Sequence, residues 1–126
     1  MSRFAWTGVV LAGGKSTRMG RDKALVEVDG KPMIQHAIDV LLPQVKELIV
    51  IGDPRKYRRF HDDIIPDELE GLGPLGGIVT AMGHARYDHL LVLACDVPEV
   101  NAKLLEKIKF HFPMDGDALV PRHQDF

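Results

Sequence analysis

The feature that most constrains the fold of this chain is a series of short, continuous apolar runs separated by segments with helical periodicity. The runs cover residues 4–11, 48–51, 89–94 and, more briefly, 118–120. An unbroken apolar run, in contrast to an alternating one, is typical of a parallel strand that is covered on both faces of its sheet. The sequence therefore predicts a parallel sheet whose strands are connected by helices.

Three segments between these runs carry apolar residues at helical spacing. The first is expected to begin at Pro32 and to stop at Pro43, and the others are expected over 78–85 and 102–110. Strands that alternate with helices in a chain of this length predict an α/β fold. We therefore expect a doubly wound, mostly parallel sheet sandwiched between helices, with a single domain over residues 1–126.

Composition and charge restrict the kinds of partner. Of the 126 residues, 45% are hydrophobic and 27% are charged, and the net charge is -2. This balance gives no overall attraction to nucleic acid or to an anionic membrane, so an anion must be bound by a local arrangement of residues. Cys95 is the only cysteine, which excludes an internal disulfide and suits a reducing cytoplasm. We expect a cytoplasmic protein with no nucleic-acid or membrane partner, because no apolar run approaches the ~20 residues of a membrane-spanning helix.

The segment after the first predicted strand combines glycine with positive charge. Gly13 and Gly14 are followed by four cations, Lys15, Arg18, Arg21 and Lys23. Loops at the carboxyl ends of parallel strands bind ligands, and glycines there let backbone N–H groups approach phosphate oxygens. Arginine can bind a polyphosphate bidentately, while lysine acts as a compact charge. The segment is therefore either a nucleoside triphosphate site or a glycine-rich turn with solvated cations.

The standard phosphate-binding fingerprints do not fit this segment. A Walker A loop requires glycine where this chain has Val9, and a Rossmann fingerprint requires glycine where it has Lys15. What remains is the spacing G-G-x-S-x-R-M-G-x-D-K over residues 13–23.

Two other places on the chain have the composition of a site. Asp96 follows the most apolar predicted strand, where a carboxylate could hold Mg²⁺ together with substrate phosphates, or could cap the turn before Pro98. The glycine-rich segment 71–77 precedes a predicted helix and is either a ligand-shaping loop or a mobile connection. Cys95 is expected to pack in the core, and the basic run 55–59 is expected to coat a solvated helix face.

The stretch LAGGKSTRMGRDKALV, residues 11–26, resembles the signature of the small nucleotidyltransferases that make the dinucleotide form of the molybdenum cofactor, specifically molybdenum cofactor guanylyltransferase. The likeness continues in register through 30–32, Asp67, 73–77 and 95–98. The resemblance implies a Rossmann-like nucleotidyltransferase fold of the glycosyltransferase-A kind. It also implies transfer of GMP from GTP to the phosphate of molybdopterin, with release of pyrophosphate, and proteins of molybdoenzyme maturation as candidate partners.

The resemblance assigns roles on the phosphate side of the nucleotide. Four residues would line the nucleotide: Leu11, Ala12, Gly13 and Gly14. Arg18 would hold the outer phosphates, and Lys23 would neutralise the region of the α-phosphate. No protein nucleophile or general base is expected, because the attacking phosphate of the pterin is already anionic.

On the base and metal side, the resemblance implies that Asp67 accepts hydrogen bonds from the base or the ribose, in a pocket shaped by Gly76. Asp96 would hold Mg²⁺. This chain departs from the family where Asn often ends the second strand: it has Ile51, so that contact is either missing or taken over by Asp53.

The family domain extends well beyond residue 126, so we expect the last third of that domain, which helps to bind the pterin, to be missing from this chain. Two alternatives stay open. One is a cytidylyl- or sugar-phosphate nucleotidyltransferase, although cytidylyl relatives tend to have Ala in place of Gly13 and to lack the GPLGG segment. The other is a GTP-binding fragment without catalytic activity.

Overall fold

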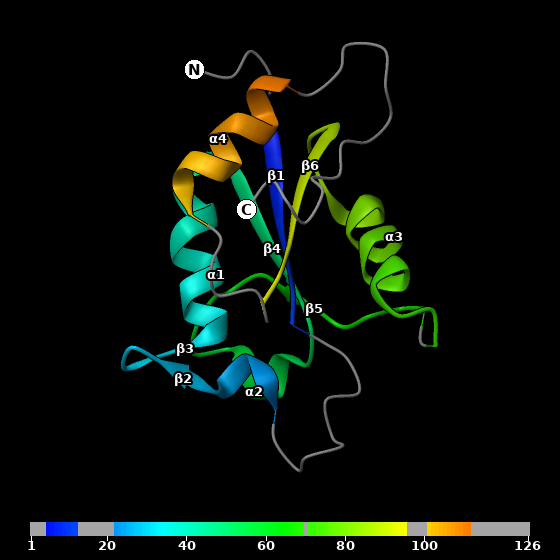
Figure 1. Cartoon of the computed structure of the whole chain (residues 1–126). Helices are drawn as coiled ribbons and strands as arrows, with labels where there is room; N and C mark the ends of the chain where they lie inside the picture. Colours follow the sequence, from blue (N-terminus) through cyan, green and yellow to red (C-terminus); the bar gives the residue numbers. More distant parts are fainter. Residues whose placement is uncertain (1–4, 13–21, 70, 96–100, 112–126) are drawn as a thin grey trace.

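The computed structural model describes residues 5–12, 22–69, 71–95 and 101–111. Its centre is a four-stranded parallel sheet with the strand order β5-β4-β1-β6 (Figure 1). The strands are β1 (Trp6–Leu11), β4 (Glu47–Ile51), β5 (Ile64–Ile65) and β6 (His89–Ala94). β1 pairs along its length with both β4 and β6, so it is the central strand of the described sheet.

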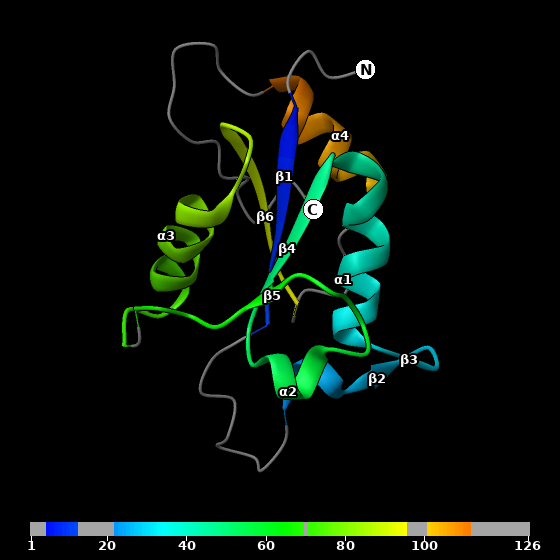
Figure 2. The same ribbon diagram turned by 180° about the vertical axis from the view of Figure 1, so that it is seen from behind.

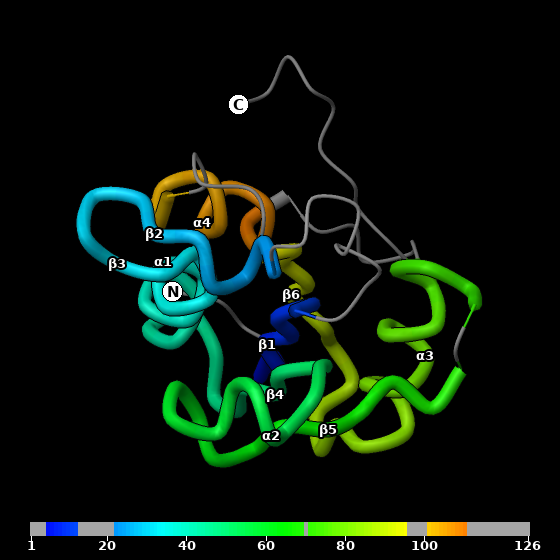
Figure 3. The backbone as a smooth tube through the Cα atoms, turned by 90° about the horizontal axis from the view of Figure 1, so that it is seen from below, coloured from blue at the N-terminus to red at the C-terminus, as the bar shows by residue number. Residues whose placement is uncertain are grey.

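Helices cover both faces of the sheet. α1 (Met33–Leu41) and α4 (Ala102–His111) lie on one face, and α3 (Pro74–His84) lies on the other (Figures 1 and 2). The view from below shows the same separation, with β1 and β6 between the two helical layers (Figure 3). The doubly wound parallel α/β sandwich expected from the sequence is therefore confirmed. None of the described helices combines the length and the apolar character needed to cross a membrane.

Short elements gather at the carboxyl end of the sheet, toward the bottom of Figure 1. They are the 3-10 turn η2 (Lys23–Leu25), the hairpin strands β2 (Glu27–Val28) and β3 (Lys31–Pro32), and the single-turn helix α2 (Pro54–Tyr57). The hairpin turns at Asp29 and Gly30, which both have positive φ (54° and 78°), as a tight two-residue hairpin turn requires. A further 3-10 turn, η3 (Leu42–Gln44), follows α1.

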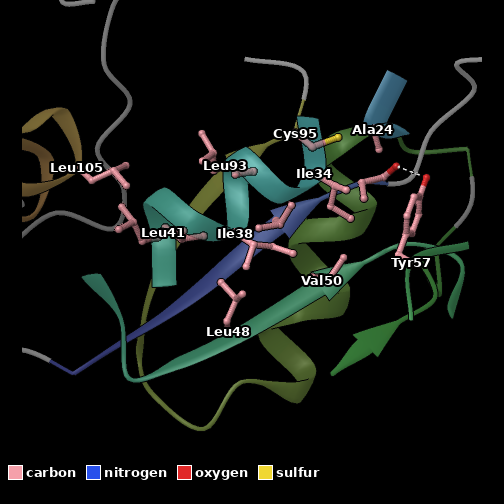
Figure 4. Close-up of a cluster of buried hydrophobic side chains, with 14 of the residues drawn as sticks. Ala24, Ile34, Ile38, Leu41, Leu48, Val50, Tyr57, Leu93, Cys95 and Leu105 are labelled. Atoms are coloured by element: carbon pink, nitrogen blue, oxygen red, sulfur yellow. Dashed lines mark hydrogen bonds between the residues drawn. The ribbon is translucent and has the colours of Figure 1, made fainter. Parts of the chain in front are cut away.

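Successive side chains of β1 point to opposite layers of the sandwich. Val10 belongs to the larger core cluster, which includes Ile38 of α1 and other buried residues (Figure 4). Val9 belongs to the second cluster, with Ile49 of β4 and Ala81 of α3. Because both faces of the strand are buried, both sets of positions are apolar. This explains the continuous apolar run in the sequence.

One glycine sets the distance between β1 and the helix above it. A Cβ atom on Gly8 would lie 3.0 Å from side-chain atoms of Leu41, Val45 and Leu48. The small residue therefore lets the end of α1 pack directly on the middle of the strand.

The helix boundaries differ in part from the sequence prediction. α3 begins at Pro74, four residues earlier than expected, because proline is tolerated in the first turn, where its missing N–H would have no partner. α1 begins at Met33, with Pro32 as the residue before it, and ends at Leu41. α4 occupies its predicted position, and the run 118–120 lies outside the described residues.

Candidate functional site

The strand order reverses direction at β1. The chain moves from β1 to β4 and β5 on one side, and then returns by way of α3 to β6 on the other side of β1. In open α/β sheets, ligands bind beyond the carboxyl ends of the strands at such a reversal. The candidate site therefore lies where β1 ends, at Leu11 and Ala12.

The end of β1 is held on both sides by backbone hydrogen bonds that continue past the strands. The N–H of Ala12 donates to the carbonyl oxygen of Ile51 (2.9 Å), and the N–H of Cys95 donates to that of Leu11 (3.2 Å). Cys95 is buried, as the sequence predicted, and it directly precedes Asp96 in the chain. The end of β6, which precedes the predicted metal ligand in the sequence, is therefore fixed against the end of β1.

Four of the predicted site residues, Gly13, Gly14, Arg18 and Asp96, lie outside the described residues. Within the described part of the chain, no group of three His, Cys, Asp or Glu side chains is arranged to hold a metal ion. The roles assigned to these four residues stay predictions.

Lys23 begins the 3-10 turn η2 and is exposed. The residue before it, Asp22, caps this turn: its Oδ1 accepts a hydrogen bond from the N–H of Ala24 (3.0 Å). At the other end of the turn, the N–H of Val26 donates to the carbonyl oxygen of Lys23 (3.2 Å). The backbone of Lys23 therefore lies between two local hydrogen bonds.

Tyr57, in α2, joins this turn to the end of β1. Its side chain is 2% exposed, and its hydroxyl donates to Oδ2 of Asp22 (2.5 Å). The carbonyl oxygen of Ala12, 3.1 Å away, is a second acceptor for the same hydroxyl. Figure 4 shows Tyr57 at the edge of the large core cluster, with its hydroxyl in a hydrogen bond. Burial, and then the Asp22 carboxylate, raise the pKa of Tyr57 well above its ordinary value.

The ring of Tyr57 fits against the chain because of a glycine. A Cβ atom on Gly52, just after β4, would lie 2.8 Å from the ring of Tyr57 and 3.4 Å from the Cβ of Ala12. A larger residue at position 52 would displace the ring. The carboxyl ends of β1 and β4 are therefore packed closely against α2.

Asp67 and Gly76, which the sequence assigned to the base side of the site, are adjacent in the structure. The Oδ1 atom of Asp67 accepts hydrogen bonds from the N–H of Leu69 (2.9 Å) and the hydroxyl of Thr80 (3.4 Å). A Cβ atom on Gly76 would lie 3.2–3.3 Å from the two carboxylate oxygens and would collide with the carbonyl oxygen of Leu69. The first turn of α3 and the segment that carries Asp67 are therefore in close contact.

The same turn of α3 also reaches the end of β1. A Cβ atom on Gly77 would lie 2.9 Å from the side chain of Leu11 and 3.4 Å from that of Ile51. Leu11 thus lies on the α3 side of the sheet, whereas Ala12 lies on the Tyr57 side. β1 ends between two groups of residues: Asp67, Gly76 and Gly77 (the base side) and Asp22, Lys23 and Tyr57 (the phosphate side).

At the end of β4, this chain has Ile51 where the family often has asparagine, and the structure shows what Ile51 and Asp53 contact there. Ile51 is 2% exposed and packs against α3, so it belongs to the core. Asp53 caps α2 by accepting a hydrogen bond from the N–H of Arg55 (2.9 Å), and both of its carboxylate oxygens also contact the Arg55 guanidinium. These bonds hold the pKa of Asp53 below its ordinary value. A role for Asp53 in place of the family asparagine stays a prediction.

Sequence analysis missed Asp22 and Tyr57. Tyr57 lies in the basic run 55–59. The charged members of this run are exposed as expected, and their pattern gives no sign that Tyr57 is buried. Asp22 lies inside the motif of residues 11–26, and its residue type just before a turn is that of an N-cap. No local pattern, however, indicates its contact with a tyrosine 35 residues away.

Comparison with known proteins agrees with this geometry. The family model described as "MobA-like NTP transferase domain" matches residues 8–125. The chain belongs to the MobA-like NTP transferase family. A molybdenum cofactor guanylyltransferase from Shewanella sp. (strain MR-4) is 47% identical over 109 residues, which are 80% of this chain and 55% of that protein. The chain spans about half the length of the curated relatives it matches.

Solved structures of nucleotidyltransferases share the fold. One is the molybdopterin-guanine dinucleotide biosynthesis protein A from Archaeoglobus fulgidus, with a TM-score of 0.63 and 26% identity over 81% of this chain and 53% of that one. Another is a CMP:2-keto-3-deoxy-manno-octonic acid synthetase complexed with CTP, with a TM-score of 0.69 and 26% identity over 85% of this chain and 48% of that one. The nucleotidyltransferase fold expected from the sequence resemblance is confirmed.

Replacing Gly76 with alanine should destabilise the chain by about 1–3 kcal/mol, because the new methyl group has no room between the carbonyl of Leu69 and the Asp67 carboxylate. Gly83→Ala, in the same helix with open space at its Cβ position, should leave stability unchanged or raise it by up to about 1 kcal/mol. Urea unfolding of both variants measures the difference. Equal stabilities would contradict the close contact at Gly76.

The raised pKa of Tyr57 predicts a loss of stability at alkaline pH. Because this pKa is higher in the folded chain than in the unfolded one, its contribution is complete below about pH 10 and is lost as the pH rises toward the folded value. Above about pH 10, the free energy of unfolding of the natural chain should fall more steeply than that of Tyr57→Phe, by up to about 1.4 kcal/mol per pH unit. Tyr87→Phe is the control and should keep the steep dependence. Identical pH profiles for the natural chain and Tyr57→Phe would refute the assignment.

Proposed function

We propose that this chain binds GTP at the carboxyl end of β1 and carries the nucleotide-binding part of an enzyme that transfers GMP to the phosphate of molybdopterin, releasing pyrophosphate. The observation that carries the proposal is the position of the end of β1. Leu11 contacts the first turn of α3 beside Asp67, and Ala12 contacts Tyr57 beside Asp22 and Lys23. Relatives named molybdenum cofactor guanylyltransferase, 44–48% identical to this chain, support this choice of nucleotide and acceptor.

On the phosphate side, Lys23 is the described cation best placed to act on the α-phosphate. It directly follows Asp22, the N-cap of η2, and its side chain is exposed at the carboxyl edge of the sheet. Lysine provides a compact charge for a phosphate oxygen, and Arg18 would add a bidentate contact to the outer phosphates. As negative charge develops during the transfer, these cations would stabilise the transition state electrostatically.

On the base side, Asp67 is suited to guanine. The Watson–Crick edge of guanine presents the ring N1–H and an exocyclic amino group, which are two neighbouring donors for a carboxylate, whereas cytosine presents only its amino group. The Oδ1 atom of Asp67 is held by Leu69 and Thr80, so the orientation of the carboxylate is set before the base arrives. Such preorganisation favours selective binding.

A carboxylate at this edge would suit Mg²⁺. This ion prefers one or two carboxylates together with substrate phosphates over a complete protein cage. Asp96, which follows the anchored Cys95, would hold the ion. When bound, Mg²⁺ would offset charge on the phosphate oxygens during an in-line displacement. The pterin phosphate needs no base from the protein, because it is anionic at neutral pH.

One alternative differs from the proposal in the base that the chain selects. The other differs in whether the chain can carry out the transfer. The likeness to a structure complexed with CTP keeps a cytidylyltransferase as the second candidate. Because the chain spans about half of its curated relatives, binding of GTP without turnover is the second outcome to test.

The experiment that tests the proposal is calorimetric titration of the chain with GTP, CTP and ATP, each with and without Mg²⁺. GTP should bind at least about tenfold more tightly than CTP or ATP, because one discriminating hydrogen-bonded contact contributes about 1.4 kcal/mol or more. Mg²⁺ should strengthen GTP binding, and Asp96→Ala should remove this gain. Preference for CTP would select the cytidylyl alternative, and folded protein that binds no nucleotide would refute the proposal.

Lys23→Ala should weaken GTP binding by about 10- to 100-fold, the range expected for loss of one charge-assisted contact to phosphate. Guanosine, which lacks phosphates, should bind both forms alike. Lys46→Ala is the matched control, because Lys46 is an exposed lysine just before β4, at the opposite end of the sheet. A loss below about threefold for Lys23→Ala, or an equal loss for Lys46→Ala, would remove Lys23 from the site.

A further inference from the structure

Tyr57 meets two segments that are far from it in the sequence at one hydroxyl group. Tyr57 is 45 residues from Ala12 and 35 residues from Asp22, and its hydroxyl lies within hydrogen-bonding distance of both. Ala12 directly follows β1, and Asp22 directly precedes Lys23. The hydroxyl therefore fixes the position of Lys23 relative to the end of β1.

Tyr57 is a rigid support for this contact. Its ring is buried in the large core cluster, against the space left by Gly52. The first turn of α2 is capped by Asp53, and the N–H of Tyr57 donates to the carbonyl oxygen of Asp53 (3.2 Å). Because ring and backbone are both held, the hydroxyl has a single position from which to donate.

Asp22 connects the Tyr57 hydroxyl to the turn that begins with Lys23. One carboxylate oxygen caps η2 through the N–H of Ala24, and the other accepts the Tyr57 hydroxyl. The ammonium group of Lys56 lies 3.6 Å from this second oxygen. The carboxylate is therefore oriented from two sides, and the turn that begins with Lys23 is oriented with it.

The same contacts direct Asp22 toward Lys56 and away from Lys23. A carboxylate next to Lys23 in the sequence could neutralise its charge, but here both oxygens are directed to other groups. Within the described segments, no carboxylate lies within ion-pair distance of Lys23. Among the described residues, no carboxylate therefore competes with an anionic ligand for its ammonium group.

We propose that Tyr57 and Asp22 are positioning residues for the phosphate side of the site, which act on the nucleotide through Lys23 and not by touching it. This inference rests on the proposed function, since it takes the phosphates of a nucleoside triphosphate as the ligand of Lys23. Removing the hydroxyl should weaken binding only of ligands that Lys23 contacts. Its effect should disappear when the lysine is absent.

A double-mutant cycle tests this coupling. Calorimetry would compare the natural chain, Tyr57→Phe, Lys23→Ala and the double variant, with GTP and guanosine as probes. Tyr57→Phe should weaken GTP binding about five- to tenfold, as expected for loss of one hydrogen bond to a charged group, and should leave guanosine binding within about twofold. In the Lys23→Ala background, the same substitution should change GTP affinity by less than about twofold.

Two further variants separate positioning from folding. Tyr87→Phe, a change at the other tyrosine of the chain, should have no effect on GTP binding. Asp22→Asn retains an oxygen to cap Ala24 but weakens the contacts with Tyr57 and Lys56. It should therefore reproduce the selective loss of GTP affinity, and it replaces Tyr57→Phe in the cycle if the latter does not fold.

The outcomes distinguish this inference from the proposed function. If the natural chain binds GTP but Tyr57→Phe binds it equally well, only the positioning role is refuted. The same holds if the substitution weakens GTP and guanosine alike, or if its effect is unchanged without Lys23, because both results indicate a general structural role. If the folded natural chain binds no GTP, the proposed function and this inference both fail.

Discussion

The burial of β1 on both faces and its pairing on both edges is the constraint on which the rest of the structure depends. β6 pairs with all of β1 and β4 pairs with Thr7 to Leu11, so the three strands end at nearly the same level. Its side chains alternate between the cluster that contains α1 and the cluster that contains α3. Any ligand that approaches the end of β1 therefore meets segments from both helical layers, and on this combination rests the proposal of a nucleotide site there.

Close packing at this edge depends on small residues. Gly52 admits the ring of Tyr57, and Gly76 and Gly77 bring the first turn of α3 against Asp67 and Leu11. In each case a single methyl group would meet an atom already in place. Such contacts hold the segments in fixed relative positions, because a close-packed interior deforms little. The base side and the phosphate side are thus related to each other through the rigid end of β1 and not through contact between mobile side chains.

The chemistry proposed for the site requires the protein mainly to position the reactants and to provide charge. An anionic acceptor phosphate needs no activation by a base, so the contribution of the chain would be to hold a triphosphate, a base and a cation in a fixed arrangement. The Tyr57–Asp22 contact suits this requirement, because it orients a turn that carries a lysine without neutralising it. The remainder of the relatives' length lies outside this chain, and acceptor binding belongs to the proposal for the whole enzyme.

The sequence by itself determined the architecture and the order of the motifs, because both are local. Continuous apolar runs reveal strands buried on two faces, helical spacing reveals the layers above them, and the motif from Leu11 to Val26 carries the family resemblance. Only the tertiary structure decided that Asp22 is held by Tyr57, that Ile51 is a core residue beside α3, and that Asp67 lies against Gly76. Each of these facts is a contact between segments separated in the chain. Packing in three dimensions, and not periodicity, determines which distant residues meet.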